Sequence, residues 1–379
     1  VNCNGRYVYM VQWNSAGAVP FFQSPDGWAV LWNNTSMTKL NPSPTELPLR
    51  PTQNTEATMT FVPEETGLYH FFLSRPTDQK FRKLQFTIGD RELLNKRPAW
   101  EPKVVAVTAE LEKGTPYPIR ATGEFRVLYH PPSARNQMVL KSEMGELIDY
   151  HFVVGNTADE RVAAYRLLTG SAPMFPAWAY GFFQSKERYE TGAELLETVK
   201  TFREKKLPLD CIVQDWRYWG KHGWNALRFD EDVFPDIRET VQTIHENNAR
   251  VMISVWPNFG DSKEGSQDRL EFFGKNGWLL ERTEETAEGG LPERARHFHS
   301  GYVDVMHPGA REAYWNLINT NIFGNGIDAL WLDATEPNLD GYQGGLRFYM
   351  THQGPGAYWL NLYPFMHSKN IYERRRATE

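Results

Sequence analysis

The sequence predicts a multidomain fold, in which an N-terminal β domain interrupted by a second β domain precedes the first half of a (β/α)8 TIM barrel. Three observations lead to this prediction. The first half of the chain alternates strand-like segments with turns rich in Pro, Gly, Asn and Ser. From about residue 175 the pattern changes to strands that alternate with helices. The length of 379 residues also exceeds that of one ordinary domain.

Two turn-rich joints divide the β-rich half of the chain. Strand signals at 7–13 and 28–33 come first, and the joint NPSPTELPLRPTQNTE follows at 41–56. A second group of strand signals ends at the joint HPPSARNQ, residues 130–137. This order predicts one β domain interrupted by another. The predicted boundaries are 1–50 with 131–174 for the partial N-terminal β domain, 51–130 for the inserted β module, and 175–379 for the partial barrel.

The second half reads as parallel β/α units, because its strands are continuous apolar runs separated by amphipathic helices. The predicted strands are GFFQSKERY with its loop, LDCIVQDW, RVMISVWPN and IDALWLDAT, at 181–189, 209–216, 250–258 and 327–335. Helices are predicted from the N-cap Thr191 to before Pro208, over 236–247, over 308–323, and in the segment 360–376. A complete barrel needs eight strands, so four predict a chain that is a fragment.

Composition excludes several classes of protein. The net charge of −6 leaves no basic face for a nucleic acid. Cys3 and Cys211 are too few and too far apart for a disulfide framework or a metal site. No run reaches the roughly 18 apolar residues of a membrane span, and VNCNGRYVYM lacks the apolar centre of a signal peptide. The 13 Trp residues suit sugar binding, since indole stacks on pyranose rings, but they equally suit a core.

Polar and aromatic residues follow the predicted strands at their carboxyl ends, which is where β/α barrels carry their function. They are Asp215, Trp216, Trp256, and Asp333 with Glu336. A doubly wound sheet would also bind ligands at this edge, but no glycine-rich phosphate loop follows the first strand. The barrel is therefore the favoured architecture, and no nucleotide cofactor is predicted.

Asp333 is the central candidate for chemistry. By position it could serve as a nucleophile, a general base or a metal ligand, or it could cap the following turn. The sequence His297-Phe-His299 lies in a loop and is weak support for a metal. Glycoside cleavage uses two carboxylates. Glu336 lies three residues after Asp333, and we interpret it as a hydrogen-bonding neighbour of Asp333 rather than as its catalytic partner.

WLDATEP resembles the nucleophile motif of glycoside hydrolase family 31, the retaining α-glucosidases and α-xylosidases. The resemblance extends over FFQSPDGWAVLWNNTS, GFFQSKERY, LDCIVQDWRYWGKHGWNALRFD and GYVDVMHPGAREAYW, which together span most of the chain outside the inserted module. It implies a galactose-mutarotase-like N-terminal sandwich. GLYHFFLS, LQFTIGDRELL and LEKGTPYPIRATGE resemble, more loosely, the protective antigen-like module. The family context implies that such an insert extends the sugar-binding cleft, and the open alternative is a rigid spacer.

The resemblance also implies roles for single residues. Asp333 would be the nucleophile that forms a covalent glycosyl intermediate. Asp215 would hydrogen-bond hydroxyl groups of the non-reducing sugar. Trp216, Trp256 and Trp331 would form the walls of that pocket, although each could instead be ordinary barrel packing. The family's acid/base aspartate lies on a later strand, so it is expected outside this chain, and the chain alone is expected to be inactive.

The segments GFFQSKERY and IVQDWRYWG are more similar to sequences of the α-xylosidase branch than to those of the digestive α-glucosidases. This similarity implies release of α-xylose from xyloglucan oligosaccharides. The first alternative is an α-glucosidase or α-glucosyltransferase of the same family. The second is a carbohydrate-binding protein without turnover, and a purely structural β-rich protein explains the strand-end residues least well. No cofactor is predicted, the predicted partner is an oligosaccharide, and the family context implies a bacterial periplasmic or cell-surface location. The oligomeric state is not predicted.

Overall fold

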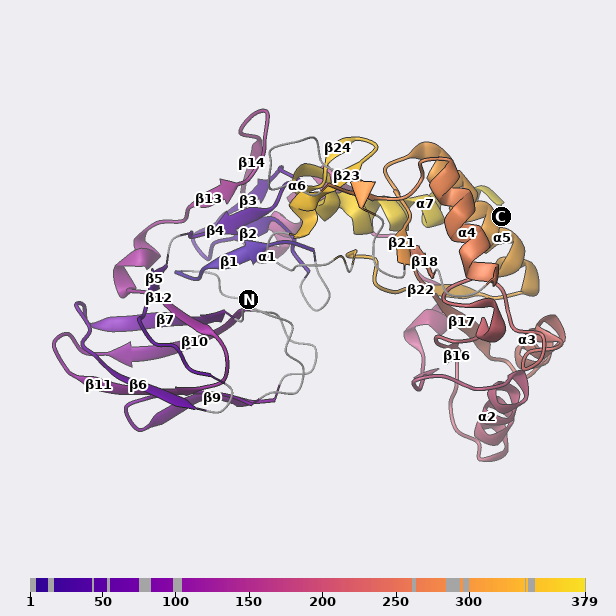
Figure 1. Ribbon diagram of the computed structural model, residues 1–379, viewed down its shortest axis with the longest axis horizontal. Helices are drawn as coiled ribbons and strands as arrows, with labels where there is room; N and C mark the ends of the chain where they lie inside the picture. The colour runs from indigo at the N-terminus through magenta and orange to yellow at the C-terminus, as the bar shows by residue number, and fades with distance from the viewer. Residues whose placement is uncertain are drawn as a thin grey trace. The chain divides into compact units, whose positions relative to one another are not determined.

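The computed structural model describes residues 5–12, 17–42, 44–52, 55–74, 83–97, 104–260, 264–283, 294–295, 300–337, 339 and 345–378. Two compact units make up the chain, Val1–Val154 and Gly155–Glu379 (Figure 1). The boundary predicted after residue 174 stays a prediction; helix α1 (Ala158–Thr169) lies between the two positions and was not predicted. Cys3, His297 and His299 lie outside the described residues.

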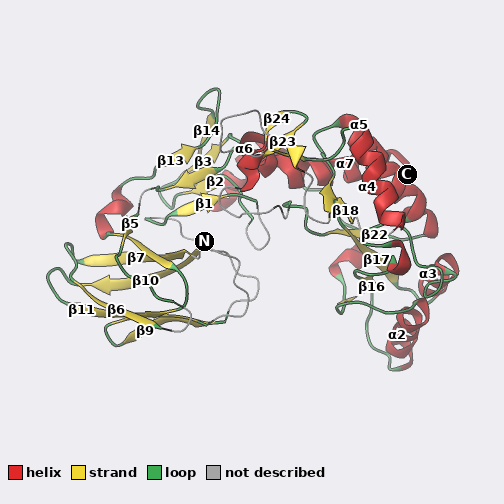
Figure 2. Ribbon diagram, viewed as in Figure 1, coloured by secondary structure: helices red, strands yellow, loops and turns green. Residues whose placement is uncertain are grey.

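All strand pairs described in the first unit are antiparallel, and strands dominate this unit (Figure 2). Two sheets have the orders β1-β4-β13 and β14-β3-β2, and two have the orders β10-β7-β12-β5 and β6-β11-β8-β9. The strands are β1 Val8–Met10, β2 Phe21–Gln23, β3 Trp28–Trp32, β4 Thr38–Leu40, β5 Thr45–Glu46, β6 Glu56–Phe61, β7 Gly67–Ser74, β8 Leu84–Ile88, β9 Arg91–Lys96, β10 Val104–Leu111, β11 Tyr117–Thr122, β12 Arg126–His130, β13 Leu140–Ser142 and β14 Tyr150–Val154.

The two four-stranded sheets share one hydrophobic core. Phe71 and Val127 contribute from one sheet, and Phe86 and Ile119 from the other, all essentially inaccessible to solvent. β8 shows why: its side chains alternate between buried and half-buried, so Leu84, Phe86 and Ile88 point to the same side. This alternation is the pattern that the sequence LQFTI predicts for a strand with one face in a core.

The second unit contains a parallel sheet with strand order β15-β16-β17-β22. The strands are β15 Phe183–Gln184, β16 Cys211–Gln214, β17 Arg250–Val255 and β22 Ala329–Leu332. Helices α2 (Gly192–Glu204) and α3 (Ile237–Glu246) connect successive strands and contact each other and the sheet. The four predicted strands and the helices between them are thereby confirmed in type and order.

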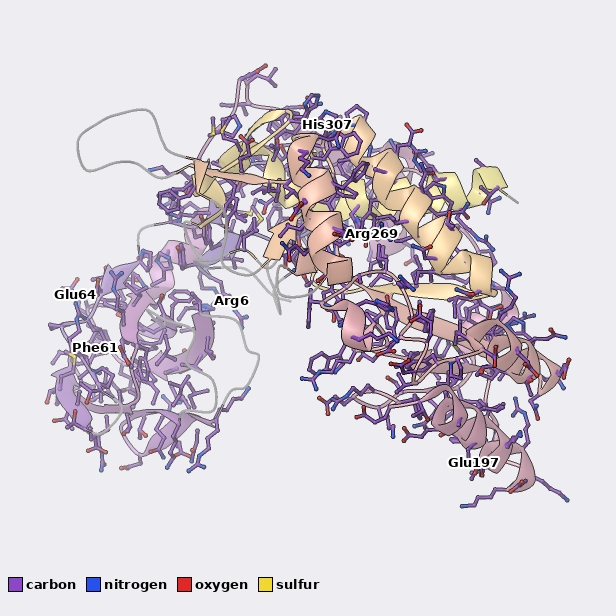
Figure 3. The ribbon with its side chains drawn as sticks, turned by 45° about the vertical axis from the view of Figure 1, so that its right-hand side comes forward. Arg6, Phe61, Glu64, Glu197, Arg269 and His307 are labelled. Carbon is purple, nitrogen blue, oxygen red and sulfur yellow. The ribbon has the colours of Figure 1, made fainter. Side chains whose placement is uncertain are left out.

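Local sequence signals explain where these helices begin. The Thr191 side chain accepts a hydrogen bond from Glu194 N, so Thr191 is the N-cap of α2 as predicted. Leu195 and Val199 are buried, whereas Glu197 lies on the exposed side of α2 (Figure 3). Helix α5 (Pro308–Asn321) begins after His307, whose Nδ1 accepts from the backbone of the first turn.

Several elements of the second unit were not predicted. Helix α4 (Glu264–Lys275) and most of the short strands fall in the excursion between the third and fourth parallel strands. Those strands are β18 Asn258–Gly260, β19 Glu281–Thr283, β20 Arg294–Ala295 and β21 Ser300–Tyr302, with β23 Tyr349–Thr351 and β24 Gly354–Pro355 further along the chain. Helix α6 (Gly356–Trp359) precedes α7 (Tyr363–Thr378), the predicted helix after the fourth parallel strand.

His367 on α7 provides a test of this packing. Its ring is fully buried against Tyr314 and Tyr363, and neither ring nitrogen has a hydrogen-bond partner among the described residues. Burial lowers the pKa of His367 from 6.5 to about 4. Between these pH values the unfolded chain binds a proton that the folded protein does not, so stability falls as the pH falls from 6.5 toward 4.

We therefore expect His367→Leu to raise the free energy of unfolding at pH 7 by about 1 kcal/mol, because an unsatisfied buried polar group is replaced by an apolar one of similar size. The advantage of the variant should grow between pH 6.5 and pH 4. Urea unfolding at several pH values measures both effects. A loss of stability at every pH would show that the imidazole has a partner that stabilises it.

Candidate active site

The carboxyl ends of the parallel strands bring the predicted residues to one edge of the sheet. Asp215 follows β16, Trp256 follows β17 and Asp333 follows β22. Two hydrogen bonds align these ends across the strands: Ser254 Oγ donates to Asp215 Oδ1 at 2.7 Å, and Asp333 N donates to Val255 O at 3.0 Å. The register pairs Ser254 with Trp331, so Asp215, Ser254 and Trp331 belong to the same face of the sheet.

Asp215 is held through one oxygen. Its Oδ1 accepts from Ser254 Oγ and from Trp216 N, the latter at 2.8 Å. Among the described residues, its other oxygen accepts no hydrogen bond. A half-buried carboxylate fixed in this way keeps one oxygen available as an acceptor for a ligand hydroxyl group.

Asp333 is half-buried at the start of a tight turn. Its Oδ1 accepts from Ala334 N at 2.7 Å, and Ala334 has a left-handed backbone with φ of 48°. Thr335 closes the turn with a 3.0 Å hydrogen bond from its Oγ1 to Leu332 O. Non-glycine residues in this conformation are costly and concentrate at functional sites. The turn fixes the direction of the Asp333 carboxylate.

The electrostatic surroundings distinguish Asp333. Burial raises the pKa of its carboxyl group above the ordinary 3.8, and the negative charge of Asp215 raises this pKa further. Hydrogen bonds from Ala334 N and the Trp256 side chain act in the opposite direction and lower the pKa. Asp215 and Asp333 are therefore close enough for their charges to interact, as expected of two carboxylates that share one ligand.

This interaction predicts a pH dependence. If Asp333 is the nucleophile, it must be ionised to attack, and the acidic limb of kcat/KM for the full-length protein should then lie above pH 3.8. Asp215→Asn removes the neighbouring negative charge, so the limb of the residual activity should move to lower pH. A pH profile of both proteins with one substrate measures the shift. If the acidic limb of the profile stayed at the same pH in Asp215→Asn, the limb would reflect the ionisation of a group other than Asp333.

Trp256 is fixed on several sides and is only 6% exposed. Its carbonyl oxygen accepts from Tyr314 Oη at 2.8 Å and from Asn225 Nδ2, while its N–H donates to Asn225 Oδ1 at 3.3 Å. The rings of Trp219 and Trp224 lie 5.3 Å from the Trp256 ring, centroid to centroid. The Trp256 side chain also acts on Asp333, because it lowers the pKa of the Asp333 carboxyl group.

Trp216 and Trp331 differ from Trp256. The Trp216 ring lies under two guanidinium groups, with Arg217 Cζ 4.3 Å and Arg188 Cζ 5.2 Å from the ring centroid. The Trp331 side chain is 49% exposed on β22. The assignment of all three Trp residues to a sugar pocket stays a prediction.

Glu336 lies within the same turn as Asp333. Its Oε2 is buried and has no hydrogen-bond partner among the described residues. The expectation that Glu336 holds Asp333 or a neighbour by hydrogen bonding stays a prediction. A buried carboxylate oxygen without a donor is costly, which is typical of residues retained for a function.

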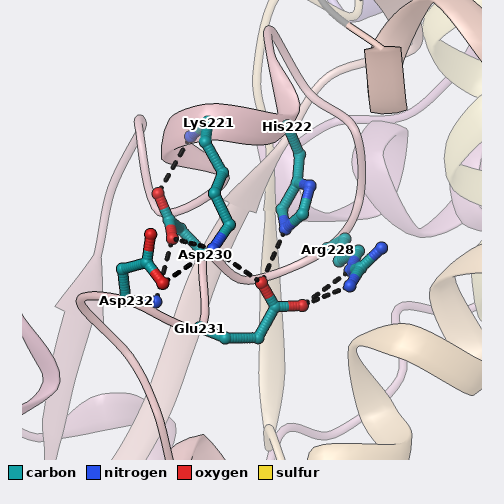
Figure 4. Close-up of polar contacts among 6 residues, drawn as sticks. All are labelled: Lys221, His222, Arg228, Asp230, Glu231 and Asp232. Atoms are coloured by element: carbon teal, nitrogen blue, oxygen red, sulfur yellow. Dashed lines mark hydrogen bonds and ion pairs between the residues drawn. The ribbon is translucent and has the colours of Figure 1, made fainter.

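A network of ion pairs stabilises the loop that follows Asp215 and Trp216 (Figure 4). Lys221 Nζ lies 2.8 Å from Asp232 Oδ1, and Glu231 pairs with both His222 and Arg228. Asp230 accepts from the backbone N–H of Lys221 at 2.9 Å. Gly220 permits this approach, because a Cβ atom there would lie 2.0 Å from the Asp230 carboxylate.

Sequence reasoning missed Ser254 and Asn225, which position Asp215 and Trp256. Ser254 could have been found from its place two residues before Trp256 on a predicted strand, whereas no sequence signal identifies Asn225. In the described part of the chain no three His, Cys, Asp or Glu side chains are grouped so that they could hold a metal ion. Nor does any helix described there combine the length and apolar character needed to cross a membrane.

Parallel strands connected by helices define an α/β fold, and the two interacting carboxylates lie at the carboxyl ends of the strands, where such folds carry their active sites. Residues 172–379 match the family described as glycosyl hydrolases family 31 TIM-barrel domain. The match covers more than half of the chain, and the chain belongs to this family.

Individual relatives agree with this assignment. An α-xylosidase of Saccharolobus solfataricus is 40% identical over 247 residues, which are 64% of this chain and 30% of the relative. α-Glucosidase 2 of Bacillus thermoamyloliquefaciens is 30% identical over 60% of this chain and 28% of its own length. The crystal structure of a family 31 α-xylosidase from Xanthomonas citri has a TM-score of 0.81 at 26% identity, over all of this chain and 47% of that one. The chain thus spans less than half of each of these proteins.

Proposed function

We propose that the protein is a retaining, exo-acting α-glycoside hydrolase that releases α-xylose from the non-reducing ends of xyloglucan oligosaccharides. The observation that carries the proposal is the pair of Asp215 and Asp333 at the carboxyl ends of β16 and β22, the two parallel strands on either side of β17, with the Asp333 carboxylate fixed by its own turn. Membership in family 31 supports the reaction class. The α-xylosidases among the relatives support the sugar.

The chemistry assigns a role to each carboxylate. Asp333 attacks the anomeric carbon, the bond to the leaving oxygen breaks as that oxygen takes a proton from a general acid, and water then releases the sugar from Asp333. The free oxygen of Asp215 accepts hydrogen bonds from sugar hydroxyl groups. We expect the general acid in the part of the relatives that this chain does not cover.

The proposal also includes the finer architecture. The parallel sheet would be the first half of a (β/α)8 barrel, and residues 1–50 with 131–174 would form an N-terminal β-sandwich that carries the inserted module 51–130. The mostly antiparallel pairing in the first unit and the four parallel strands in the second support this division. Function at the carboxyl ends of successive strands is the behaviour of such barrels.

The test is kcat/KM of the protein from its complete reading frame on aryl α-xyloside and on aryl α-glucoside. A strong preference for the xyloside supports the proposal. The two sugars differ by one hydroxymethyl group, and steric or apolar discrimination of this size is worth about 1–3 kcal/mol, or roughly 10- to 200-fold. Turnover of neither substrate, together with tight sugar binding, would instead support a carbohydrate-binding protein.

A second candidate function is an α-glucosidase or α-glucosyltransferase. The 30% identity to the α-glucosidase of Bacillus thermoamyloliquefaciens favours it. This candidate predicts a preference for the glucoside, with Asp333 in the same role. Hydrolysis and transfer are then separated by adding an acceptor sugar, since transfer makes a longer product in place of free sugar.

A further inference from the structure

Trp216 follows Asp215 directly, and its ring is covered by cations from two loops. Arg188 belongs to the loop after β15 and Arg217 to the loop after β16. Their guanidinium carbons lie 5.2 Å and 4.3 Å from the centroid of the ring. Such contacts hold a planar guanidinium group parallel or tilted over an indole while its N–H groups remain available at the rim.

The two arginines differ in their charge partners. Arg188 pairs with Glu187 at 2.8 Å and with Glu190 at 2.9 Å, and its side chain is only 19% exposed. Arg217 is exposed and, among the described residues, its side chain forms no hydrogen bond or ion pair. Arg188 thus serves to hold Trp216, whereas the donors of Arg217 are free.

In the two loops, residues 185–190 and 215–236, which are fully described, every other Lys and Arg has a carboxylate partner. Lys186 pairs with Glu194. Lys221 pairs with Asp232 and Arg228 with Glu231 (Figure 4). Carboxylates are plentiful there, so the lack of a partner for Arg217 does not come from a shortage of acids. The backbone of Arg217 is also left-handed, with φ of 68°, a conformation that is costly for arginine.

We propose that Arg217 is a specificity-determining residue whose guanidinium group, held over Trp216, donates hydrogen bonds to the leaving-group sugar of the substrate. In the proposed function Asp215 holds the reacting sugar, and its carboxylate is fixed by Ser254 Oγ and Trp216 N rather than by Arg217. We therefore assign the free donors of Arg217 to the other part of the substrate. In an exo-acting enzyme that part is the leaving group. The inference rests on the proposed function.

The experiment uses the protein from its complete reading frame with two substrates. One is a xyloglucan oligosaccharide, which has a sugar leaving group, and the other is α-xylosyl fluoride, whose leaving group offers nothing to Arg217. Arg217→Met keeps the contact with the Trp216 ring but removes every donor. Arg217→Lys keeps the charge without the planar fork. Arg238→Met, at an exposed arginine on α3, is the control.

We expect Arg217→Met to lower kcat/KM for the oligosaccharide about 10- to 100-fold, the usual effect of losing hydrogen bonds from a charged group. Hydrolysis of the fluoride should stay near the wild-type rate. The kcat/KM of Arg217→Lys for the oligosaccharide should lie between those of Arg217→Met and the wild type. Arg238→Met should match the wild type on both substrates, and Tm should be unchanged in all variants.

Other outcomes overturn the inference in distinguishable ways. Equal losses on both substrates would mean that Arg217 acts on the reacting sugar or on the fold. No loss on either would mean that it has no contact with the substrate. A wild-type protein that turns over neither substrate would refute the proposed function and this inference with it.

Discussion

Asp333→Asn should abolish turnover by the full-length protein while it makes the fold more stable. The carboxamide cannot form the glycosyl ester, and loss of a residue that forms the covalent intermediate lowers kcat by on the order of 10⁴-fold or more. Burial and the charge of Asp215 raise the pKa of Asp333, so the ionised group destabilises the folded state above that pKa. Its removal should therefore raise Tm at neutral pH, and the gain should vanish below pH 3.8, where Asp333 is protonated in both states.

A matched control lies on the same strand. Asp328 precedes β22 at its opposite end, where it accepts from His245 Nε2 and Val251 N at 2.8 Å and pairs with Arg250 at 3.1 Å. Asp328→Asn weakens these contacts, so it should lower Tm and leave turnover per folded molecule unchanged. The two variants thus have opposite effects on stability and on activity.

Covalent labelling completes this test. An activated 5-fluoro glycosyl fluoride should modify the wild-type protein at Asp333, which peptide mass spectrometry identifies, and should fail to modify Asp333→Asn. Near-normal turnover by Asp333→Asn, or labelling at another carboxylate, would remove Asp333 from the role of nucleophile. The binding-only alternative predicts sugar binding without any labelled peptide.

The parallel sheet could be predicted because its signals are local. Four apolar runs alternate with helices. The caps and apolar faces of these helices are formed by residues close together in the sequence, such as Thr191, Leu195 and Val199. The strand-end carboxylates Asp215 and Asp333 follow from the same pattern, since parallel strands place their carboxyl ends together. The periodicity of apolar residues therefore predicts both the order of strands and helices in this unit and the carboxylates that are its candidate catalytic residues.

The parts that could not be predicted depend on contacts between distant residues. Helix α1 has a capping box at Thr157 and Glu160, but its only buried residue is Arg161, so it lacks the apolar stripe that marks a helix in a sequence. The contacts of Arg188 and Arg217 with the Trp216 ring join two loops that are separated in the sequence, so no local pattern predicts them. Positive-φ residues such as Ala334 also carry no compositional signal, because alanine rarely adopts that conformation.

Asn225→Ala should cause the largest loss of stability among the variants considered. The Asn225 side chain is inaccessible to solvent and donates to the carbonyl oxygens of Trp256 and Asn258, while it accepts from Trp256 N. Its removal takes one partner from each of Trp256 N, Trp256 O and Asn258 O, and Trp256 O keeps the hydrogen bond from Tyr314 Oη. We expect a loss of about 2–4 kcal/mol in the free energy of unfolding, and lower kcat because the Trp256 side chain no longer holds Asp333 in place.

Backbone strain must be separated from these hydrogen bonds, because Asn225 has φ of 50°, where alanine is less favourable than asparagine. Asn248 supplies the control, since its φ is 53° but its side chain is exposed and forms no hydrogen bond among the described residues. Asn248→Ala should cost only about 1 kcal/mol, from the backbone alone. If the two variants lost equal stability in urea unfolding, Asn225 would matter only for its turn. A larger loss for Asn225→Ala, with kcat reduced and substrate binding retained, would show that this buried amide holds Trp256 and Asp333 in register for the reaction.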